Sequence, residues 1–336
     1  MSRGVQLGVS LAISAGALWY CFHDSDLHAL GRTLAAARWT WIAVMAGITV
    51  LTMWLRGMRW KLLLSAVGPV DRTPVISATC VGFMGNMVLP LRAGEAIRPF
   101  VVARSGQISM PAALATVAID RLFDMVMLGV FSSLTLLMVP AGEGLRTAAR
   151  GIVIVVALAV VTLGVIIRAS QWIELRATPL VERLPGVLGR VVKQGMIGFL
   201  HGVRGLTDLR RLVSVLFFSA AIWLTVVFMF VTGALALEIE APLMPLGFAA
   251  TVIVAAFVSA PSAPGFLGVY QAGSEIALKL FDVQKTTSDA FGIITWAVQM
   301  VVIVGLGMWA LSRLNLSLGD VAAKAEAAEE EAEPAT

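Results

Sequence analysis

Long apolar stretches recur through almost the whole chain, and they decide what it can fold into. They begin at Val5 and end at Leu311, and few charged residues interrupt them. Hydrophobic residues make up 58% and charged residues only 14% of the 336 residues, whereas a soluble domain carries about 25% charged residues. A soluble chain of this length could not bury so much apolar surface. The sequence therefore predicts an all-α polytopic membrane protein and excludes a soluble enzyme, a nucleic-acid-binding protein and a disordered chain.

Six of the apolar stretches are long enough to cross a bilayer as helices, which takes about 20 residues each. The predicted spans are about 5–22, 41–64, 112–139, 151–167, 213–237 and 290–311. The first also resembles a signal peptide. No small-x-small cleavage site follows it, and we therefore expect it to stay in the protein.

Two further apolar stretches, 75–104 and 246–281, are interrupted near their middle by proline and glycine. Proline removes a backbone donor and glycine loosens the backbone, so each stretch is expected to form two short helices rather than one span. Such a pair of short, broken apolar segments predicts two re-entrant hairpins. The breaking residues are Pro90 and Gly94 in the first hairpin and Pro261, Pro264 and Gly265 in the second.

The hairpins occupy equivalent places in two units, 41–139 and 213–311, each made of a span, a hairpin and a second span. The first breaking prolines, Pro90 and Pro261, stand at the same distance from the starts of their units to within a residue or two. Because three spans separate the starts of the units, the second unit is inverted relative to the first. Inverted units with paired broken helices are typical of transporters whose site lies at the bilayer midplane. The alternative is two unrelated loops.

Lysine and arginine counts predict the orientation. With the N-terminus inside, the cytoplasmic segments hold 18 of these residues and the external segments 6, which favours two cytoplasmic termini in a bacterial inner membrane. The segment 168–212 carries 8 basic and 3 acidic residues, and we expect it to lie on the cytoplasmic face as a basic interfacial segment. The membrane domain would be residues 1–313, followed by an acidic C-terminal tail at 314–336.

Charged side chains within the apolar stretches are candidate functional residues, because charge in hydrocarbon is costly. Asp120, Arg121 and Asp124 lie inside a predicted span, with the two carboxylates four residues apart on one helix face. Two interpretations stay open for this group. It forms a transport site, or it forms a salt-bridge network that holds helices together.

A second polar group surrounds the break in the first hairpin. Asn86 can satisfy backbone groups that the break frees, and Arg98 can pair with Glu95 three residues before it. Arg92 and Arg98 suit a phosphate group, because a guanidinium binds phosphate through two parallel hydrogen bonds. We predict that these four residues bind substrate together with the three charged residues of the span.

Other polar residues have simpler explanations. Arg56, Arg59 and Lys61 end the second span and are expected to anchor it at the cytoplasmic interface. Gln271 and Gln299 sit in apolar surroundings, where they either bond neighbouring helices or line a cavity.

The sequence predicts no cofactor and no metal site. Its three histidines lack metal-ligand spacing, and it has no HExxH, CxxC, GxSxG or Walker A motif. Without an ATP-binding motif, turnover is expected to run downhill or to be coupled to protons or ions. Glu95, Asp120 and Asp124 are the candidate proton carriers. An enzyme is the least expected class.

Three motifs stand in order along the chain. The run from Asn86 to Arg98 reads N-x3-P-x-R-x-G-E-x-x-R, the next span contains D-R-x-x-D from Asp120, and P-x-x-P-G-x-x-G-V starts at Pro261. Over about residues 5–313 they resemble the lysylphosphatidylglycerol synthetase transmembrane family, also called flippase-like domain proteins. The resemblance implies lipid translocation, here by a stand-alone member without the synthase domain. Gln271 stands where members often carry Glu, and Gln299 lies in a span where many carry Arg, so we expect a different preference for substrate charge.

The sequence therefore predicts a lipid flippase. It would move a polar-headgroup lipid, whether a phospholipid, an aminoacyl-lipid or a polyprenyl-linked lipid, through a polar cavity between the two units. One alternative is a small-molecule or ion-coupled secondary transporter on the same scaffold. Another is a non-transporting membrane partner of a lipid-modifying enzyme. The expected partners are membrane lipids, with such a lipid-synthesising enzyme as a candidate and no nucleic acid.

Overall fold

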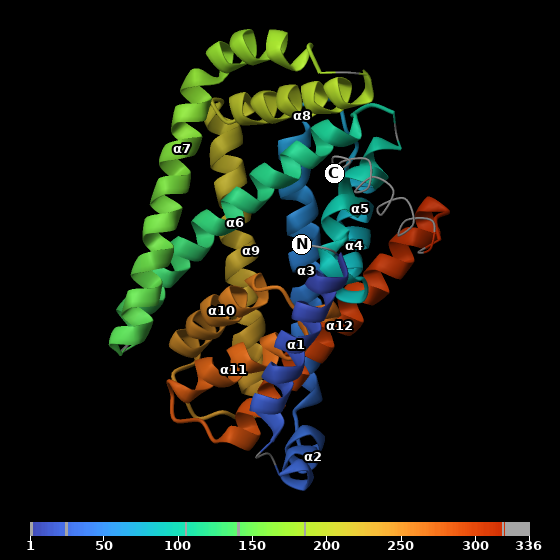
Figure 1. Ribbon diagram of the computed structural model, residues 1–336. Helices are drawn as coiled ribbons and strands as arrows, with labels where there is room; N and C mark the ends of the chain where they lie inside the picture. The colour runs from blue at the N-terminus through green and yellow to red at the C-terminus, as the bar shows by residue number, and fades with distance from the viewer. Residues whose placement is uncertain are drawn as a thin grey trace.

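The computed structural model describes residues 3–23, 26–104, 106–139, 142–184, 186–317 and 319, and all regular structure among them is helical (Figure 1). This confirms the predicted all-α fold. The helices are α1 (Arg3–Phe22), α2 (Leu27–Ala35), α3 (Trp39–Leu64), α4 (Arg72–Val88), α5 (Gly94–Ala103), α6 (Met110–Met138), α7 (Glu143–Val181), α8 (Gly186–Gly205), α9 (Leu209–Ala236), α10 (Leu243–Ser259), α11 (Val269–Lys279) and α12 (Lys285–Leu314), with the 3₁₀ turns η1 (Pro90–Arg92) and η2 (Pro264–Phe266).

Several of these helices are long enough to cross a bilayer. Within the described residues, length and hydropathy select four, which are Trp39–Leu64, Arg150–Val181, Leu209–Ala236 and Lys285–Leu314. At 29 residues α6 is equally long, but it carries three charged residues in its middle. The predicted first span is helix α1, of which Gly8–Cys21 is the apolar part. The chain is therefore a multi-pass membrane protein.

Both predicted hairpins are broken helices that turn back on themselves. Leu89, which precedes Pro90, is extended at φ −97° and ψ 149°, because a residue before proline avoids the helical region. After η1, α5 returns against α4. The return is tight at Gly94, where a Cβ atom would lie 1.8 Å from the carbonyl oxygen of Gly82. Only glycine permits this approach of the two arms.

The second hairpin follows the same plan, with α10 and α11 as its arms. Ala260, which precedes Pro261, is extended at φ −69° and ψ 152°. Gly265 and Gly268 then adopt positive φ values of 68° and 87°, a region in which a side chain is strained. The two breaks thus use the proline and glycine residues that the sequence pattern singles out.

The two units repeat the same elements at nearly the same lengths. Helices α3, α4, α5 and α6 have 26, 17, 10 and 29 residues, and α9, α10, α11 and α12 have 28, 17, 11 and 30. The contacts between units are also reciprocal: α3 packs on α9, α4 packs on α12, and α10 packs on α6. Such reciprocity is the pattern of a two-fold relationship.

The tips of the two hairpins meet inside the molecule. The Arg92 guanidinium donates a hydrogen bond to the Val258 carbonyl and lies 5.6 Å from the centre of the Phe266 ring. A Cβ atom on Gly265 would lie 3.1 Å from the Met87 carbonyl oxygen. In Figure 1, α4 and α5 reach this meeting point from the end where α8 lies, and α10 and α11 reach it from the opposite end.

Helix α1 packs on the second hairpin. The Ser14 hydroxyl accepts a hydrogen bond from the backbone N–H of Ala263, at 2.7 Å. A Cβ atom on Gly268 would lie 2.5 Å from the Ser14 carbonyl oxygen. The predicted first span therefore serves as a neighbour of the broken helix.

Two features differ from the predicted boundaries. A short helix, α2, follows α1, with Asp26 as its N-cap. Helix α7 does not end at 167 but continues to Val181, so the predicted interfacial segment begins inside a continuous helix. At 39 residues, α7 spans roughly 58 Å and exceeds the hydrocarbon core of about 30 Å. Most of the predicted acidic tail, 318 and 320–336, lies outside the described residues.

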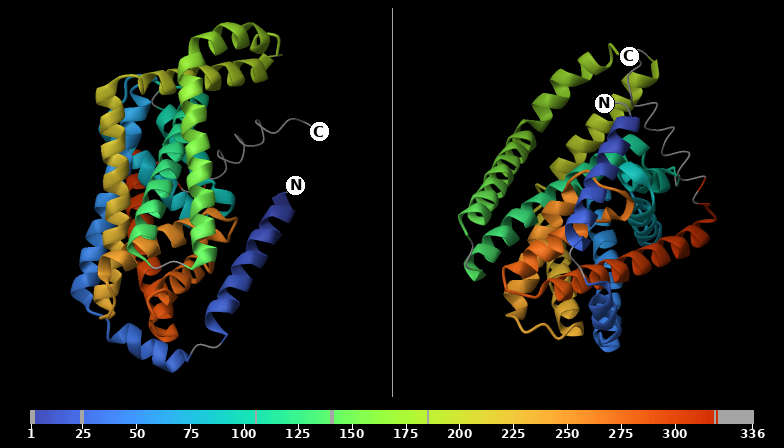
Figure 2. Two further views of the ribbon diagram at one scale, coloured as in Figure 1. Left: turned by 90° about the vertical axis from the view of Figure 1, so that its left-hand side faces the viewer. Right: turned by 60° about the horizontal axis from the view of Figure 1, so that its bottom comes forward.

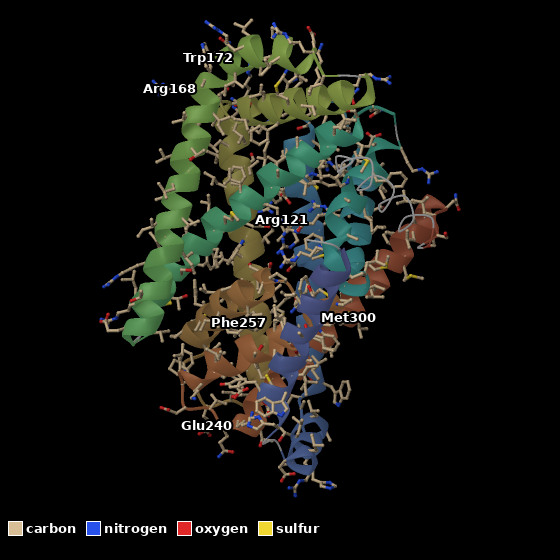
Figure 3. The ribbon with its side chains drawn as sticks, viewed as in Figure 1. Arg121, Arg168, Trp172, Glu240, Phe257 and Met300 are labelled. Atoms are coloured by element: carbon tan, nitrogen blue, oxygen red, sulfur yellow. The ribbon has the colours of Figure 1, made fainter. Side chains whose placement is uncertain are left out.

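The two ends of the molecule carry different structures. Figure 2 shows α7 along one edge of the bundle, and its neighbours are α6 and α8. Figure 3 places Arg168 and Trp172 at the end with α8, Glu240 at the opposite end and Arg121 between them. Arg121 thus lies at mid-height in the bundle.

Candidate functional site

A cavity of about 430 Å³ lies where the hairpin tips meet. Both units line it, through α3, α4, η1, α5 and α6 of the first and α9, α10, η2, α11 and α12 of the second. Its size falls in the range of about 300–1,000 Å³ that is usual for small-molecule sites. The charged residues in its wall are Arg56, Arg92, Glu95, Arg121 and Asp124.

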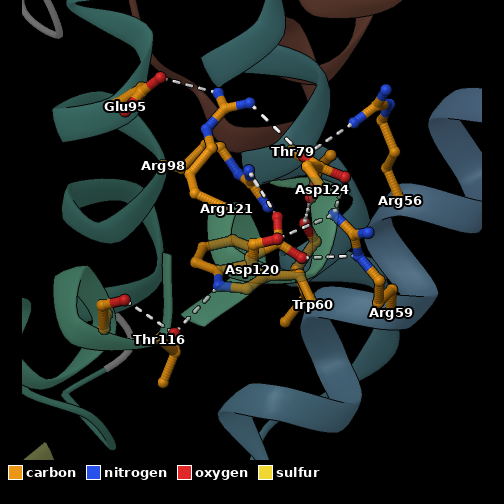
Figure 4. Close-up of polar contacts among 12 residues, drawn as sticks. Arg56, Arg59, Trp60, Thr79, Glu95, Arg98, Thr116, Asp120, Arg121 and Asp124 are labelled. Atoms are coloured by element: carbon orange, nitrogen blue, oxygen red, sulfur yellow. Dashed lines mark hydrogen bonds and ion pairs between the residues drawn. The ribbon is translucent and has the colours of Figure 1, made fainter. Parts of the chain in front are cut away.

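These charged residues belong to a larger ionic network in the first unit, which consists of ion-paired residues and the neighbouring Arg92. Figure 4 shows most of it. Five arginines face three carboxylates, which leaves a formal charge of +2. The arginines are Arg56 and Arg59 of α3, Arg92 of η1, Arg98 of α5 and Arg121 of α6, and the carboxylates are Glu95 of α5 and Asp120 and Asp124 of α6.

The buried part of the network is centred on Asp120, which does not line the cavity. Its Oδ1 lies 2.8 Å from Arg59 Nε, and its Oδ2 lies 3.4 Å from Arg98 Nη1. Arg59 also reaches Asp124 at 2.8 Å and donates to the Ser219 hydroxyl at 3.2 Å. Both arginines are fully buried, at 0% and 2% exposure.

Aromatic packing supports this buried part. The Arg98 guanidinium lies 4.3 Å from the Trp60 ring centre, a distance typical of a cation–π contact. Trp60 in turn donates its indole N–H to the Thr116 hydroxyl at 3.0 Å. The buried part therefore joins α3 and α5 to α6 through Asp120, and joins α3 to α9 through Arg59.

The part of the network that faces the cavity is more exposed. Arg121 lies 2.8 Å from Glu95 and 3.6 Å from Asp124, and Arg56 lies 3.7 Å from Asp124. Arg121 and Glu95 are each 34% exposed. These ion pairs can exchange partners with a ligand, since their groups reach the cavity.

Arg92 differs from the other four arginines, because it forms no ion pair within the described residues. Its backbone φ of 57° places it in the left-handed region. The bond to Val258 uses one nitrogen of the guanidinium, and the side chain lines the cavity. Arg92 therefore offers the network's most available positive charge to a ligand.

The seven predicted substrate-binding residues lie close together, but only five of them line the cavity. Asn86, Arg92, Glu95, Arg121 and Asp124 line the cavity, whereas Arg98 and Asp120 lie behind its wall. The Asn86 side-chain oxygen is buried and has no hydrogen-bond partner among the described residues. The predicted pairing of Arg98 with Glu95 is wrong, because Arg98 turns inward to Asp120 and Glu95 pairs with Arg121.

The assignment of Arg56 and Arg59 to interfacial anchoring is also wrong. Arg59 is the most central cation of the network, and Arg56 lines the cavity and stacks 4.9 Å above Phe83. Their spacing of three residues, which puts both on one helix face, was the available signal. Hydropathy alone could not show that this face points into the protein.

The two glutamines have separate roles. Gln271 accepts a hydrogen bond from the Gly268 backbone N–H at 2.8 Å and thereby caps α11. Gln299 lines the cavity and donates to the Tyr270 hydroxyl at 2.7 Å.

Within the described residues, no group of three or more His, Cys, Asp or Glu side chains could hold a metal ion.

Comparisons with known proteins agree with the motifs. The model of the family described as "Lysylphosphatidylglycerol synthase TM region" matches residues 7–307. A protein of Haloferax volcanii named glycosyltransferase AglD is 27% identical over 319 aligned residues, covering 82% of this chain and 49% of the relative. The chain thus spans about half the length of that curated relative. No solved structure matches. With nearly its whole length matched, the chain belongs to the lysylphosphatidylglycerol synthase transmembrane-region family.

Proposed function

We propose that this protein moves a lipid with an anionic headgroup between the leaflets of the membrane, and that the headgroup passes through the cavity between the hairpins. The observation that carries the proposal is the place of the ionic network, at mid-height in a membrane protein and open to a cavity lined by both units. Charged groups in such a position are costly unless they serve a transported ligand or hold the fold together.

The charge of the cavity favours an anion. Three arginines and two carboxylates line it, and both carboxylates already have arginine partners. A phosphate could bind Arg92 directly and compete with Glu95 for Arg121, because guanidinium groups bind phosphate and carboxylate in the same forked geometry. A cavity of about 430 Å³ suits a headgroup, while the chains of the lipid would stay in the bilayer.

The hairpin tips supply a means of opening the cavity alternately to the two sides. The contacts of Arg92 with Val258 and Phe266 join the first hairpin to the second. Binding of a phosphate to Arg92 would weaken these contacts and free one hairpin to move relative to the other. Movement would run downhill or be coupled to protons or ions, with both termini in the cytoplasm of a bacterial cell.

The family membership and the relative named as a glycosyltransferase support a role in lipid-related processes. The alternatives are transport of a small molecule or ion by the same cavity, and a non-transporting partnership with a lipid-synthesising enzyme. Neither alternative has an observation of its own in its favour. The excess of positive charge in the cavity would suit a small anion, but it fits a phosphate-bearing lipid at least as well.

The test is lipid movement by the purified protein in vesicles. Tail-labelled phospholipids in the inner leaflet should become accessible to an external quencher when the protein is present. Arg92→Gln should abolish this movement and leave the protein folded, since Arg92 has no buried carboxylate partner to strand. Arg38→Gln is the matched control, because Arg38 pairs with Glu238 at a site where both are 62% exposed. Lack of movement with the unaltered protein would overturn the proposal and favour a non-transporting partner.

A further inference from the structure

Residues at equivalent positions of the two units line the same cavity. Helix α6 begins at Met110 and its counterpart α12 begins at Lys285. When these starts are aligned, the lining residues Arg121 and Asp124 correspond to Trp296 and Gln299, which also line the cavity. Equivalent positions of the two units therefore line the same cavity.

The other elements show the same correspondence. Aligning the starts of α5 and α11 pairs Glu95 with Tyr270. Aligning the starts of the turns η1 and η2 pairs Arg92 with Phe266, and these two side chains are in contact. All of these residues line the cavity. At each of these positions a charged residue of the first unit is matched by a neutral one of the second.

This difference holds for the whole wall. Every charged residue that lines the cavity belongs to the first unit. The second unit contributes five of the six aromatic residues of the wall, which are Trp223, Phe230, Phe266, Tyr270 and Trp296. The cavity thus has a charged half and an aromatic half.

The aromatic half also presents a small set of oriented polar groups. Trp296 donates to the Gly265 carbonyl at 2.7 Å, which holds its ring in place. Gln299 uses its amide N–H groups on the Tyr270 hydroxyl and the Thr295 carbonyl. Its own carbonyl oxygen has no partner among the described residues, so it can accept a hydrogen bond from a ligand in the cavity.

We propose that the cavity selects a lipid phosphodiester whose headgroup is a neutral, ring-shaped polyol such as a sugar. The phosphate would lie against the arginines of the first unit, and the ring against the aromatic half. The C–H faces of such a ring are apolar and stack on aromatic side chains, while its hydroxyl groups meet Gln299 and Tyr270. This inference rests on the proposed function and names the substrate class of the same cavity.

A cationic headgroup, such as a lysyl ester, is the competing class because aromatic rings also attract cations. The charges of the wall oppose it. Glu95 and Asp124 are held by arginines, and the network as a whole carries an excess of positive charge. An ammonium group in this cavity would be repelled by Arg92 and Arg121.

The experiment compares headgroups on identical tails in phosphatidylcholine vesicles containing the full chain. One set is tail-labelled phosphatidylinositol, phosphatidic acid and lysylphosphatidylglycerol, and a second pair is a polyprenyl phosphate with and without a hexose. We expect the inositol and hexose lipids to move fastest. Gln299→Leu should reduce their advantage over the bare phosphate by about tenfold, the effect of one hydrogen bond. Met308→Ala, on an exposed position of the same helix, is the matched control and should keep the preference.

The outcomes separate this inference from the proposed function. If the bare phosphate lipids move as fast as the inositol and hexose lipids, or if lysylphosphatidylglycerol moves fastest, the inference is wrong while lipid transport stands. If no lipid moves, both are wrong. Gln299→Glu supplies a second readout that does not depend on protein yield. It adds a carboxylate to the aromatic half of the wall and should shift the preference toward the lysyl headgroup. An unchanged preference would count against a headgroup site at Gln299.

Discussion

Asp120→Asn should destabilise the protein strongly, because Asp120 is the shared counter-ion of two fully buried arginines. The substitution keeps the shape of the side chain and one acceptor oxygen. It removes the negative charge that lies 2.8 Å from Arg59 and 3.4 Å from Arg98, and it turns an amide donor toward one of these donors. Arg98 already has two nitrogen atoms, Nε and Nη2, without hydrogen-bond partners among the described residues.

The expected magnitude follows from burial. Removing one partner of a buried ion pair costs about 3–5 kcal/mol, a large share of the roughly 5–15 kcal/mol that stabilises a typical protein. At roughly 2–4 °C per kcal/mol, the unfolding temperature in detergent should fall by roughly 6–20 °C. The shift is measured by heating detergent-solubilised samples to a series of temperatures and determining by size-exclusion chromatography how much folded protein remains.

Glu95→Gln is the matched control within the same network. Glu95 also pairs with an arginine at 2.8 Å, but both partners are 34% exposed, so its loss should cost about 1 kcal/mol or less. If Asp120→Asn unfolds within a degree of the unaltered protein and nevertheless stops lipid movement, Asp120 belongs to the transport path. The structural interpretation of the buried part would then be refuted.

Three further predictions concern the hairpins and the topology. Gly94→Ala should destabilise the protein by about 1–3 kcal/mol, because the added methyl group would lie 1.8 Å from the Gly82 carbonyl oxygen. Thermal unfolding in detergent measures the loss, and an unchanged unfolding midpoint would contradict the tight return of the hairpin. Cysteines replacing Leu89 and Ser262, one beside each hairpin break and neither in the cavity wall, should leave lipid movement in vesicles intact until a short bifunctional reagent joins them. Movement that survives complete cross-linking would show that the hairpin tips need not part. A cysteine replacing Arg190 should react only with a reagent applied from the cytoplasmic side, and labelling from outside would reverse the predicted orientation.

The charge difference between two otherwise matching units explains how one symmetric scaffold can hold an asymmetric substrate. In the first unit, Glu95, Arg121 and Asp124 form ion pairs at the cavity wall. In the second, Tyr270 and Gln299 form a neutral hydrogen bond in the corresponding place. Nearly equal element lengths give the two halves the same plan, while the side chains make them chemically different.

Much of the fold was determined locally and could be predicted from the sequence. The hairpin breaks follow from proline and glycine, whose backbone effects do not depend on distant residues, and Pro90, Gly94, Pro261, Pro264 and Gly265 lie where the helices end. The order of spans and hairpins followed from the lengths of the apolar runs. The end of α7 did not, because hydropathy falls at 168 while the helix, which is stabilised by its own hydrogen bonds, continues to Val181.

The roles of the charged residues were decided only by the tertiary structure. The sequence showed that Asp120 and Arg98 are costly in hydrocarbon, but not that they neutralise each other behind the cavity wall. Arg59 resembles an interfacial anchor by position, yet it lies 2.8 Å from two carboxylates of α6, a helix far from it along the chain. Ion pairing depends on which helix faces meet, and that is set by the packing of α3 against α6 and α9 and of α5 against α6. Residue type alone therefore identified the charged groups, and only their packing separated the buried network from the groups that face the cavity.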